Sequence, residues 1–432
     1  MRIAVVGAGI AGLGAAWLLS RRHEVVLFEA AGRLGGHTHT HRVQHDGREY
    51  AIDSGFIVFN PPGYPLLTRL FDALGVASQA TTMSFSVQHA GSGLEYNAGT
   101  LNGLFCQRRN LLSPRFLRMV ADILRFYREA PALLAGHDAG PTLADYLAEH
   151  RYSRGFAEDH LLPMASALWS SPQAGVGAFP ARYLVQFMAN HRMLQVEGRP
   201  QWRVVRGGSA RYVEAMTANW NVQVRLDCAV RRVARDAAGV AIDSRAGHER
   251  FDQVVLACHA DDALALLADP SAAEREILGA IDYRGNDTVL HTDARLLPRD
   301  RRAWAAWNAY IPAAPEAACT VSYCMNLLQS LERAPPFVVT LNRSAAIDPA
   351  QVIARMNYRH PQYTATSVAA QRRRDEISGR RHTWYAGAYW GWGFHEDGLR
   401  SAVEVAAALG EHWPAAGSAQ HAVSAREPGL AA

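Results

Sequence analysis

Residues 2–39, RIAVVGAGIAGLGAAWLLSRRHEVVLFEAAGRLGGHTHT, decide the fold of this chain. The apolar run 2–7 suits a buried parallel strand and leads into a G-x-G-x-x-G turn that opens a helix. A second strand at 25–29 ends on Glu29, whose carboxylate can hold a ribose 2′-hydroxyl. This order of strand, glycine turn, helix, strand and acid predicts a dinucleotide-binding βαβ unit.

The glycine turn supplies the backbone that a pyrophosphate needs. Its first glycine permits the tight turn, its second lets the phosphates approach the backbone, and its third packs the helix on the strand. The helix N-terminus adds free N–H groups and a partial positive charge. The predicted contact residues of this unit are Gly7, Ala8, Gly9, Ile10, Ala11, Gly12, Glu29 and Ala30.

A second glycine pair follows in Arg33-Leu34-Gly35-Gly36-His37, and a nicotinamide site has no need of it. With this segment the chain resembles the superfamily of FAD-dependent amine oxidases, protoporphyrinogen oxidases and phytoene desaturases. In that superfamily an R-x-G-G-R/H turn completes the pyrophosphate cradle. The resemblance therefore implies FAD as the cofactor, with contacts from Arg33, Gly35, Gly36 and His37.

The resemblance resumes further along the chain. Residues 53–56, DSGF, look like the D-x-G segment that runs beside the flavin ring, which implies contacts from Gly55 and Phe56. Residues 204–216 and 222–230 continue it, and Val230 is expected to meet the adenine through its backbone.

Residues 384–409, WYAGAYWGWGFHEDGLRSAVEVAAAL, resemble the C-terminal flavin-contacting motif of the superfamily. A short strand ending at Gly387 is expected to lead to a helix that begins near Leu399 and points at the flavin pyrimidine, with Asp397 as its N-cap. The dipole of such a helix favours negative charge on the ring. Gly387, Asp397 and Leu399 join the expected FAD contacts.

The resemblance also implies an α/β fold in which a Rossmann-like FAD-binding domain is interleaved with an α+β substrate domain. We expect the FAD-binding domain at residues 1–75, 200–270 and 380–415. The substrate domain would comprise residues 76–199, read as mainly helical, and 275–375, read as strands. Residues 416–432 are small, polar and aperiodic, which predicts a flexible tail.

Periodicity supports a helix that begins after Ser113-Pro114, a good pair for an N-cap and a first helical residue. Its apolar face would carry Phe116, Val120, Ile123, Leu124 and Tyr127, and its polar face Arg115, Arg118, Asp122, Arg125 and Glu129. A second helix is expected at 157–169, with a kink or boundary at Pro163. Strands are expected at 288–292, 319–326 and 337–342.

Composition narrows the function classes. Of the 432 residues, 49% are hydrophobic and 19% charged, and the net charge of +4 is too weak to indicate a nucleic-acid partner. The five cysteines include no C-x-x-C pair, which argues against a disulfide scaffold or a metal site and fits the reducing cytoplasm. No stretch is long and apolar enough to cross a bilayer. The arginine-rich face of 115–128 has two interpretations, a solvated surface or a contact with anionic lipid at the inner membrane surface.

The chain contains no lysine, so all 44 basic residues are arginine. Many amine-oxidising relatives place a lysine-bound water against flavin N5, and this chain cannot. The candidate catalytic residues lie in the aromatic loop before the C-terminal helix, which is expected to point at the flavin. His395 and Glu396 are candidate bases, and Tyr389 is a further candidate catalytic residue.

More narrowly, phrases such as DSGFIVFN, HLLPMASALWS and YWGWGFHEDGLRSAVEVA resemble a bacterial group of FAD-binding proteins. Its members are often encoded beside cyclopropane-fatty-acid-synthase-like methyltransferases. The association implies an unsaturated or methylated fatty acyl substrate and a lipid methyltransferase as partner. The leading hypothesis is a desaturase or dehydrogenase that passes an allylic hydride to flavin N5 while a base takes the partner proton.

Two alternatives stay open. One is an oxidase of amines or other small polar substrates, which would need carboxylates or an aromatic cage for the ammonium group. The other is a flavin-loaded protein without turnover that serves a lipid methyltransferase as partner.

Overall fold

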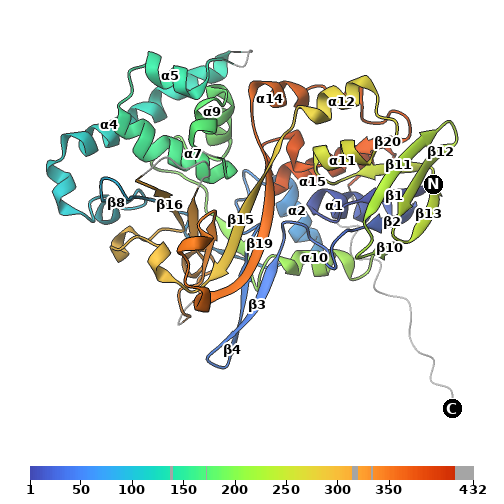
Figure 1. Ribbon diagram of the computed structural model, residues 1–432, viewed down its shortest axis with the longest axis horizontal. Coiled ribbons are helices and arrows are strands. Elements are labelled where there is room, and N and C mark those ends of the chain that lie inside the picture. The colour runs from blue at the N-terminus through green and yellow to red at the C-terminus, as the bar shows by residue number, and fades with distance from the viewer. Residues whose placement is uncertain (137–139, 172, 314–319, 332–333, 414–432) are drawn as a thin grey trace.

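The computed structural model describes residues 1–136, 140–171, 173–313, 320–331 and 334–413. The tail expected at 416–432 lies outside these residues, as does Cys319. Figure 1 shows two halves side by side, and the long strands β15 and β19 run between them.

One half is built on a five-stranded parallel sheet in the order β10-β2-β1-β14-β20. Its strands come from three separated stretches of the chain, because each parallel neighbour must be reached by a crossover. They are β1 (Arg2–Val6), β2 (Glu24–Phe28), β10 (Val222–Arg225), β14 (Gln253–Leu256) and β20 (Thr383–Tyr385).

Both faces of this sheet are covered, and the alternation of side chains along β1 shows it. Ile3 and Val5 pack in one core with the helices α1, α2, α10 and α15, whereas Ala4 and Val6 pack in another with β11–β13, α11 and α12. The first group comprises α1 (Ile10–Leu19), α2 (Pro65–Leu74), α10 (Ala210–Thr217) and α15 (His395–Ala408). The second comprises β11 (Val230–Asp236), β12 (Gly239–Ser244), β13 (Gly247–Phe251), α11 (Ala260–Leu266) and α12 (Ala272–Gly279).

The other half holds a seven-stranded mixed sheet in the order β19-β15-β18-β17-β16-β7-β8. The strands are β7 (Phe85–His89), β8 (Leu94–Asn97), β15 (Tyr283–His291), β16 (Trp307–Ile311), β17 (Val321–Cys324), β18 (Val338–Leu341) and β19 (Val352–Pro361). The helices packed beside it are α3 (Leu101–Leu104), α4 (Pro114–Glu129), α5 (Leu143–Glu149), α6 (Arg154–Phe156), α7 (Leu162–Trp169), α8 (Gln173–Gly177) and α9 (Ala181–Asn190).

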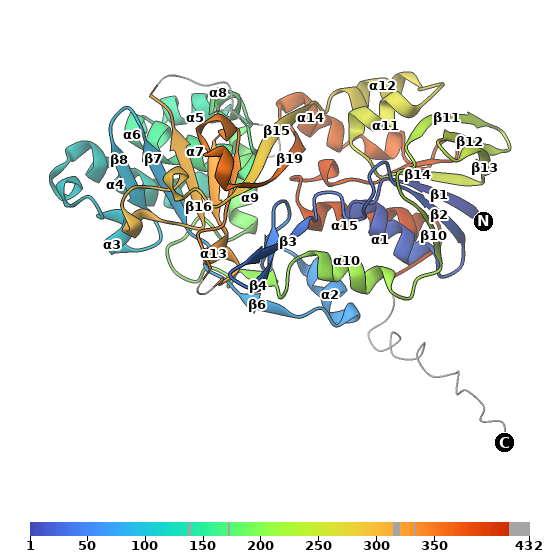
Figure 2. The same ribbon diagram turned by 60° about the horizontal axis from the view of Figure 1, so that its bottom comes forward.

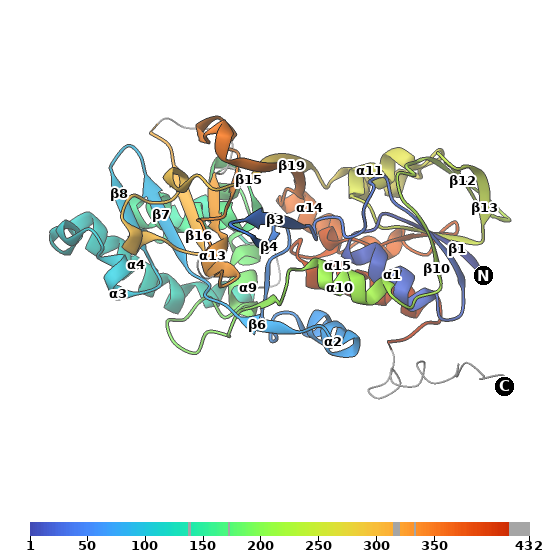
Figure 3. The same cartoon turned by 90° about the horizontal axis from the view of Figure 1, so that it is seen from below.

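Short elements join the halves, as the view from below in Figure 3 shows. They are the hairpin β3 (Thr40–His45) and β4 (Arg48–Asp53), the small sheet of β5 (Val58–Phe59), β9 (Arg203–Val205) and β6 (Ser78–Ala80), and the helix α14 (Ala365–Gln371). The short helix α13 (Met325–Leu328) instead packs on β17 and β18 of the large sheet.

The helix expected after Ser113 is confirmed as α4, and the Ser113 side chain accepts a hydrogen bond from Phe116 N. The boundary at Pro163 is also confirmed, because a π-helical turn (Ala157–Leu161) ends there and α7 begins at Leu162. Asp122 was expected on the polar face and is instead buried. Its carboxylate accepts hydrogen bonds from Arg118 Nε at 3.2 Å and from Ser153 N at 3.0 Å.

Residues 76–199 are mainly helical, as the sequence predicts, and they also contribute β7 and β8 to the edge of the large sheet. The strand expected at 319–326 needs correction, because it ends at Cys324, where the chain turns into α13. Strand pairing in this sheet is non-local, so short segments gain their structure from distant partners.

Candidate active site

The glycine turn after β1 has the geometry that the sequence predicts. Gly7 has a φ of +102°, and a Cβ on Gly12 would lie 1.8 Å from Gly7 O, so neither position tolerates a side chain. Gly9 precedes α1, and a Cβ placed there would meet nothing within 4 Å. The first and third glycines are thus required by packing, whereas the second faces the open space that a pyrophosphate would need.

Glu29 lies at the end of β2 beside this turn. Its carboxylate accepts hydrogen bonds from Ala8 N and from Ala31 N, each at 2.8 Å, which ties the two loops together. Ala30 is exposed between them, and Val230 is half-buried at the start of β11. These residues surround the edge of the sheet on which the sequence places a dinucleotide.

The second glycine pair rests on the first turn. Gly35 and Gly36 both have positive φ, and a Cβ on Gly36 would lie 2.9 Å from Gly9 Cα. Arg33 donates to Gly36 O at 2.7 Å and to Thr38 O at 3.0 Å, so its guanidinium holds the loop in shape. The pair therefore extends the backbone cradle, as the resemblance implied.

The D-x-G segment locks this loop from the other side. A Cβ on Gly55 would lie 2.0 Å from His37 O, and Phe56 N donates to the same carbonyl at 2.9 Å. Asp53 is buried and accepts hydrogen bonds from Ser209 N and Ser209 Oγ, which fix the start of α10. Burial raises the pKa of Asp53 to about 6.

The aromatic loop of the C-terminal motif folds back on itself after β20. A Cβ on Gly387 would lie 2.1 Å from the ring of Tyr389, which is buried in the core behind the parallel sheet. Leu399 is also buried, and a Cβ on Gly14 of α1 would lie 2.9 Å from its Cδ1. Their side chains thus pack the protein interior, and only backbone atoms of Leu399 are left for a cofactor.

The helix of this motif begins at His395, earlier than the expected start near Leu399. Asp397 is therefore not the N-cap but the third residue of α15. Its Oδ2 accepts hydrogen bonds from Trp392 N at 3.0 Å and Phe394 N at 3.1 Å, so it closes the aromatic loop onto the helix start.

Glu396 has a partner that the sequence did not reveal. Its two carboxylate oxygens accept hydrogen bonds from Leu66 N and Leu67 N, each at 3.0 Å. These N–H groups belong to the first turn of α2, so Glu396 caps that helix from a distant element. The carboxylate is thereby directed toward α2.

A cavity of about 840 Å³ lies where the two halves meet. His37, Gly55, Phe56 and His395 line it from the dinucleotide side. The opposite wall comes from the substrate half and is mainly apolar and aromatic. It includes Val120, Ile123, Met164, Leu168, Trp169 and Phe187.

His395 lies at this junction within a hydroxyl network. Its Nε2 is 2.9 Å from Thr38 Oγ1 and 3.2 Å from Tyr212 OH, and its ring stacks on Phe56 at a centroid distance of 3.7 Å. Burial lowers the pKa of His395 to about 3, so the imidazole stays neutral at physiological pH. Of the three candidate catalytic residues, His395 lines the cavity, whereas Tyr389 is packed in the core and Glu396 caps α2.

The other histidines of the cavity are uncharged for the same reason. Burial is the largest cause in every case, and neighbouring histidines add to it for His37 and His360. The groups with a lowered pKa are His37, His160, His191 and His360.

Sequence reasoning missed several polar groups at this junction. Thr38 and Tyr212 hold His395, while Tyr358 OH lies 2.8 Å from Ser54 Oγ and its ring contacts that of His37 edge-on. His360 also lies beside His37, at a ring distance of 5.3 Å. Tyr358 and His360 are two residues apart on β19, so their side chains lie on the same face of the strand. This spacing could have indicated that they meet at one site.

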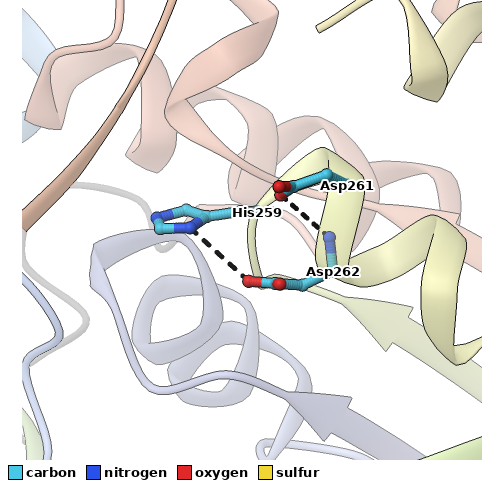
Figure 4. Close-up of side chains that lie close together, drawn as sticks. All are labelled: His259, Asp261 and Asp262. Atoms are coloured by element: carbon cyan, nitrogen blue, oxygen red, sulfur yellow. Dashed lines mark hydrogen bonds and ion pairs between the residues drawn. The ribbon is translucent and has the colours of Figure 1, made fainter. Parts of the chain in front are cut away.

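One acidic cluster of the described residues resembles a cation site. His259, Asp261 and Asp262 offer ligand atoms within 4.8 Å of one another (Figure 4). The Arg359 guanidinium already forms ion pairs with both carboxylates. Because this arginine already pairs with both carboxylates, we assign no metal to the cluster.

Comparison with known proteins supports this interpretation of the dinucleotide site. The family model described as flavin containing amine oxidoreductase matches residues 10–292. The Mycobacterium tuberculosis protein AofH, by name a flavin-containing monoamine oxidase, is 29% identical over 279 residues, which cover 62% of this chain and 59% of AofH. An L-amino-acid oxidase of Siganus canaliculatus is 24% identical over 312 residues, covering 67% of this chain and 56% of its own. The chain thus matches little more than half the length of either relative.

Solved structures share the fold. A protoporphyrinogen oxidase by title, from Exiguobacterium sp. 255-15, has a TM-score of 0.68 at 18% identity and covers 94% of this chain and 98% of its own. A fatty acid isomerase from P. acnes that produces CLA has a TM-score of 0.66 at 16% identity, with the same coverage. The family match, the glycine cradle and the open space beside Gly9 agree. The chain belongs to the flavin containing amine oxidoreductase family, and its cofactor is FAD.

Proposed function

We propose that the protein is an FAD-dependent oxidoreductase that desaturates an unsaturated or methylated fatty acyl chain. One observation carries the proposal: among the described residues that line the cavity, none is aspartate or glutamate. An ammonium group buried there would lack a counter-charge, and an unpaired buried charge is strongly unfavourable. The hydrocarbon part of an acyl chain is uncharged and needs no counter-charge.

The walls of the cavity suit a hydrocarbon. Val120, Ile123 and Leu124 of α4 line the cavity together with Met164 and Leu168 of α7. Each buried methylene of a bound chain contributes roughly 0.8 kcal/mol through the hydrophobic effect. A long chain can thus be held without a directed polar contact along its length.

The charged lining residues lie at the surface. Arg192 and Arg199 line the cavity and are exposed, whereas the buried histidines of the lining are neutral. This distribution matches an acyl chain whose carboxylate or phosphate end stays at the opening while its apolar part enters. Arginine pairs with either anion through two parallel N–H donors.

Bound FAD supplies the two-electron acceptor for a hydride from the substrate carbon. Formation of the new double bond also requires a group that accepts a proton from a second carbon. His395 fits this role because it is neutral, lines the cavity and lies beside Gly55 and Phe56 of the expected flavin contacts. Burial leaves a ring nitrogen unprotonated at neutral pH and so able to accept this proton, while the same lowered pKa makes the imidazole a weaker base than a free histidine.

Oxidation of an amine or another small polar substrate is the second candidate. The names of AofH and the Siganus canaliculatus L-amino-acid oxidase favour it, and the cavity contains aromatic rings such as Trp169 and Trp392. The absence of a carboxylate from the described lining residues argues against it. The predicted lipid methyltransferase partner is a further proposal and is consistent with an acyl substrate.

The two functions can be separated by anaerobic mixing. The FAD-loaded protein is combined with an unsaturated fatty acid, with its phospholipid ester, or with small primary amines, and the visible absorbance of oxidised flavin is followed. Bleaching by either lipid but not by amines is expected, together with a conjugated diene in the recovered chain. Bleaching by amines alone would replace the proposal with the second candidate, and an unchanged spectrum with every compound would contradict both.

A further inference from the structure

Large apolar side chains are exposed together at one end of the molecule. Leu112 is 88% exposed, Leu101 78% and Val196 65%, which is unusual for side chains of this size. The other exposed large apolar residues of the described chain, such as Leu226 and Leu327, lie in other elements. We call the group the apolar patch, and it consists of Leu101, Leu111, Leu112, Leu117, Leu124 and Val196.

The apolar patch adjoins the cavity. Leu101, Leu124 and Val196 belong to the patch and also line the cavity. Leu117 and Leu124 are seven residues apart on α4, so they lie on the same face of that helix. Figure 2 shows α3 and α4 at the end of the molecule farthest from the N-terminus.

The surroundings of the patch carry a positive charge. Residues 101–128 contain six arginines and one acidic residue, Asp122, which is buried. Arg108, Arg109, Arg192 and Arg199 are exposed, and none forms an ion pair with a carboxylate in the described part of the chain. We call these four arginines the basic rim.

We propose that the apolar patch docks on an anionic lipid bilayer, so that an acyl chain passes from the membrane into the cavity without crossing water. The inference rests on the proposed acyl substrate. Inserted leucines would gain the free energy of apolar burial, while the basic rim would contact lipid phosphates. A second copy of this chain fits the surface poorly, because symmetric contact would bring two basic rims together. No helix of the described residues is both long and apolar enough to cross a membrane, so the contact is with the membrane surface.

Vesicle co-sedimentation of the FAD-loaded full chain tests the charge requirement. Vesicles of phosphatidylglycerol and phosphatidylcholine should bind the protein about tenfold or more tightly than phosphatidylcholine alone, and salt should weaken the binding. Replacing two rim residues, in the variant Arg108→Gln/Arg109→Gln, should weaken binding to the anionic vesicles by about tenfold. Equal binding to both vesicle types, or no binding, would overturn the proposal.

A matched pair of variants tests the position of the contact. Leu112→Glu/Leu117→Glu should reduce vesicle binding by about tenfold or more, because it places two charges in the apolar patch. Leu226→Glu/Leu327→Glu makes the same change at exposed leucines outside the patch and should bind like the unmodified protein. An equal loss in both variants would refute the assignment of the contact to the patch.

Flavin bleaching separates this proposal from the proposed function. Leu112, Leu117, Arg108 and Arg109 are not among the described residues that line the cavity. In their variants, detergent-dispersed fatty acid should therefore still bleach the flavin. If the fatty acid bleaches the flavin but the protein does not bind vesicles, the docking proposal is overturned and the proposed function stands. Vesicle binding without bleaching by any lipid would overturn the function and leave the surface contact standing. Size-exclusion chromatography that shows Leu112→Glu/Leu117→Glu converting a dimer to a monomer would assign the patch to a second copy and refute membrane docking.

Discussion

At the scale of single residues, three glycines of one motif have different physical roles. Gly7 and Gly12 are fixed by close packing, since side chains there would meet the backbone of Ala257 and of Gly7 itself. Gly9 has an ordinary negative φ, and a Cβ at this position would have no neighbour within 4 Å. The requirement of the motif for glycine at this position is therefore explained by the ligand and not by the fold.

The substitution Gly9→Ala tests this difference. We expect the apoprotein to keep its melting temperature, while the affinity for FAD falls about tenfold or more because a methyl group stands where the phosphates approach. Titration of the apoprotein with FAD, followed by flavin fluorescence, measures the loss. Gly12→Ala is the control and should destabilise the fold itself, since its Cβ would lie 1.8 Å from Gly7 O.

His395 and Glu396 are adjacent, yet their environments predict opposite phenotypes. His395→Gln should slow anaerobic flavin reduction by the acyl substrate about a hundredfold, the lower end of the usual effect of a general base. Glu396→Gln should leave that rate nearly unchanged and lower stability by about 1 kcal/mol, because it weakens the cap of α2. Stopped-flow spectroscopy of both variants measures the rate of flavin reduction, and urea unfolding measures the free energy of unfolding. The reverse pattern would exclude His395 as the proton acceptor.

At the scale of elements, a buried ion pair joins β11, α12 and β20. The side chains of Arg235 and Glu274 are 1% and 2% exposed, and Glu274 Oε1 also accepts a hydrogen bond from Tyr385 OH at 2.6 Å. The Arg235 guanidinium donates to Glu274 Oε1 at 2.5 Å and to Glu274 Oε2 at 3.0 Å. This cluster fixes the layer behind the parallel sheet to the strand that leads into the aromatic loop.

The variant Arg235→Ala is expected to lose about 3–5 kcal/mol of unfolding free energy, because it leaves the Glu274 carboxylate buried without its partner. Arg250→Ala provides the control. Arg250 pairs with Asp236 at the end of β11 but is 48% exposed, so its loss should cost far less than the loss of Arg235. Urea unfolding of both variants measures the difference, and similar losses would show that burial does not control this pair.

At the scale of the whole molecule, the cavity is a region of low charge with buried, neutral histidines. His160 illustrates the consequence for pH dependence. Its pKa is lowered from 6.5 to about 4 by burial, so the unfolded chain takes up a proton at a higher pH than the folded protein does. The stability associated with this residue is present above pH 6.5 and is lost as the pH falls toward 4. Asp53 has the opposite effect. Its pKa is raised to about 6 in the folded protein, so its contribution to stability increases as the pH falls.

We expect His160 to lower the unfolding free energy at pH 5 by about 2 kcal/mol relative to pH 7. His160→Gln removes the titrating group and keeps a polar side chain that can hydrogen-bond to Tyr96 OH, as His160 Nδ1 does at 2.9 Å. The decrease between pH 7 and pH 5 should therefore be smaller in the variant by about that amount. Urea unfolding at the two pH values measures it, and an identical decrease in both proteins would contradict the assignment.

Local motifs explain why so much of the dinucleotide half could be predicted. The glycine turn, Glu29 and the second glycine pair lie within a single βαβ unit, where neighbours in sequence are also neighbours in space. The Ser113 cap and the boundary at Pro163 are local for the same reason. The start of α15 was misplaced because Asp397 closes the loop through backbone groups that no spacing rule predicts.

The sequence by itself determined the βαβ unit, because this unit depends on short-range backbone requirements of glycine and on a terminal acid. It also indicated the family and the cofactor, through the resemblance of its motifs to those of FAD-dependent amine oxidases. Only the tertiary structure decided that Glu396 caps α2 while His395 faces the cavity. It also decided that β19 brings Tyr358 and His360 beside His37, and that the cavity adjoins exposed leucines. The physical reason is that these contacts join residues tens to hundreds of positions apart, and their side-chain directions are set by packing that local patterns do not encode.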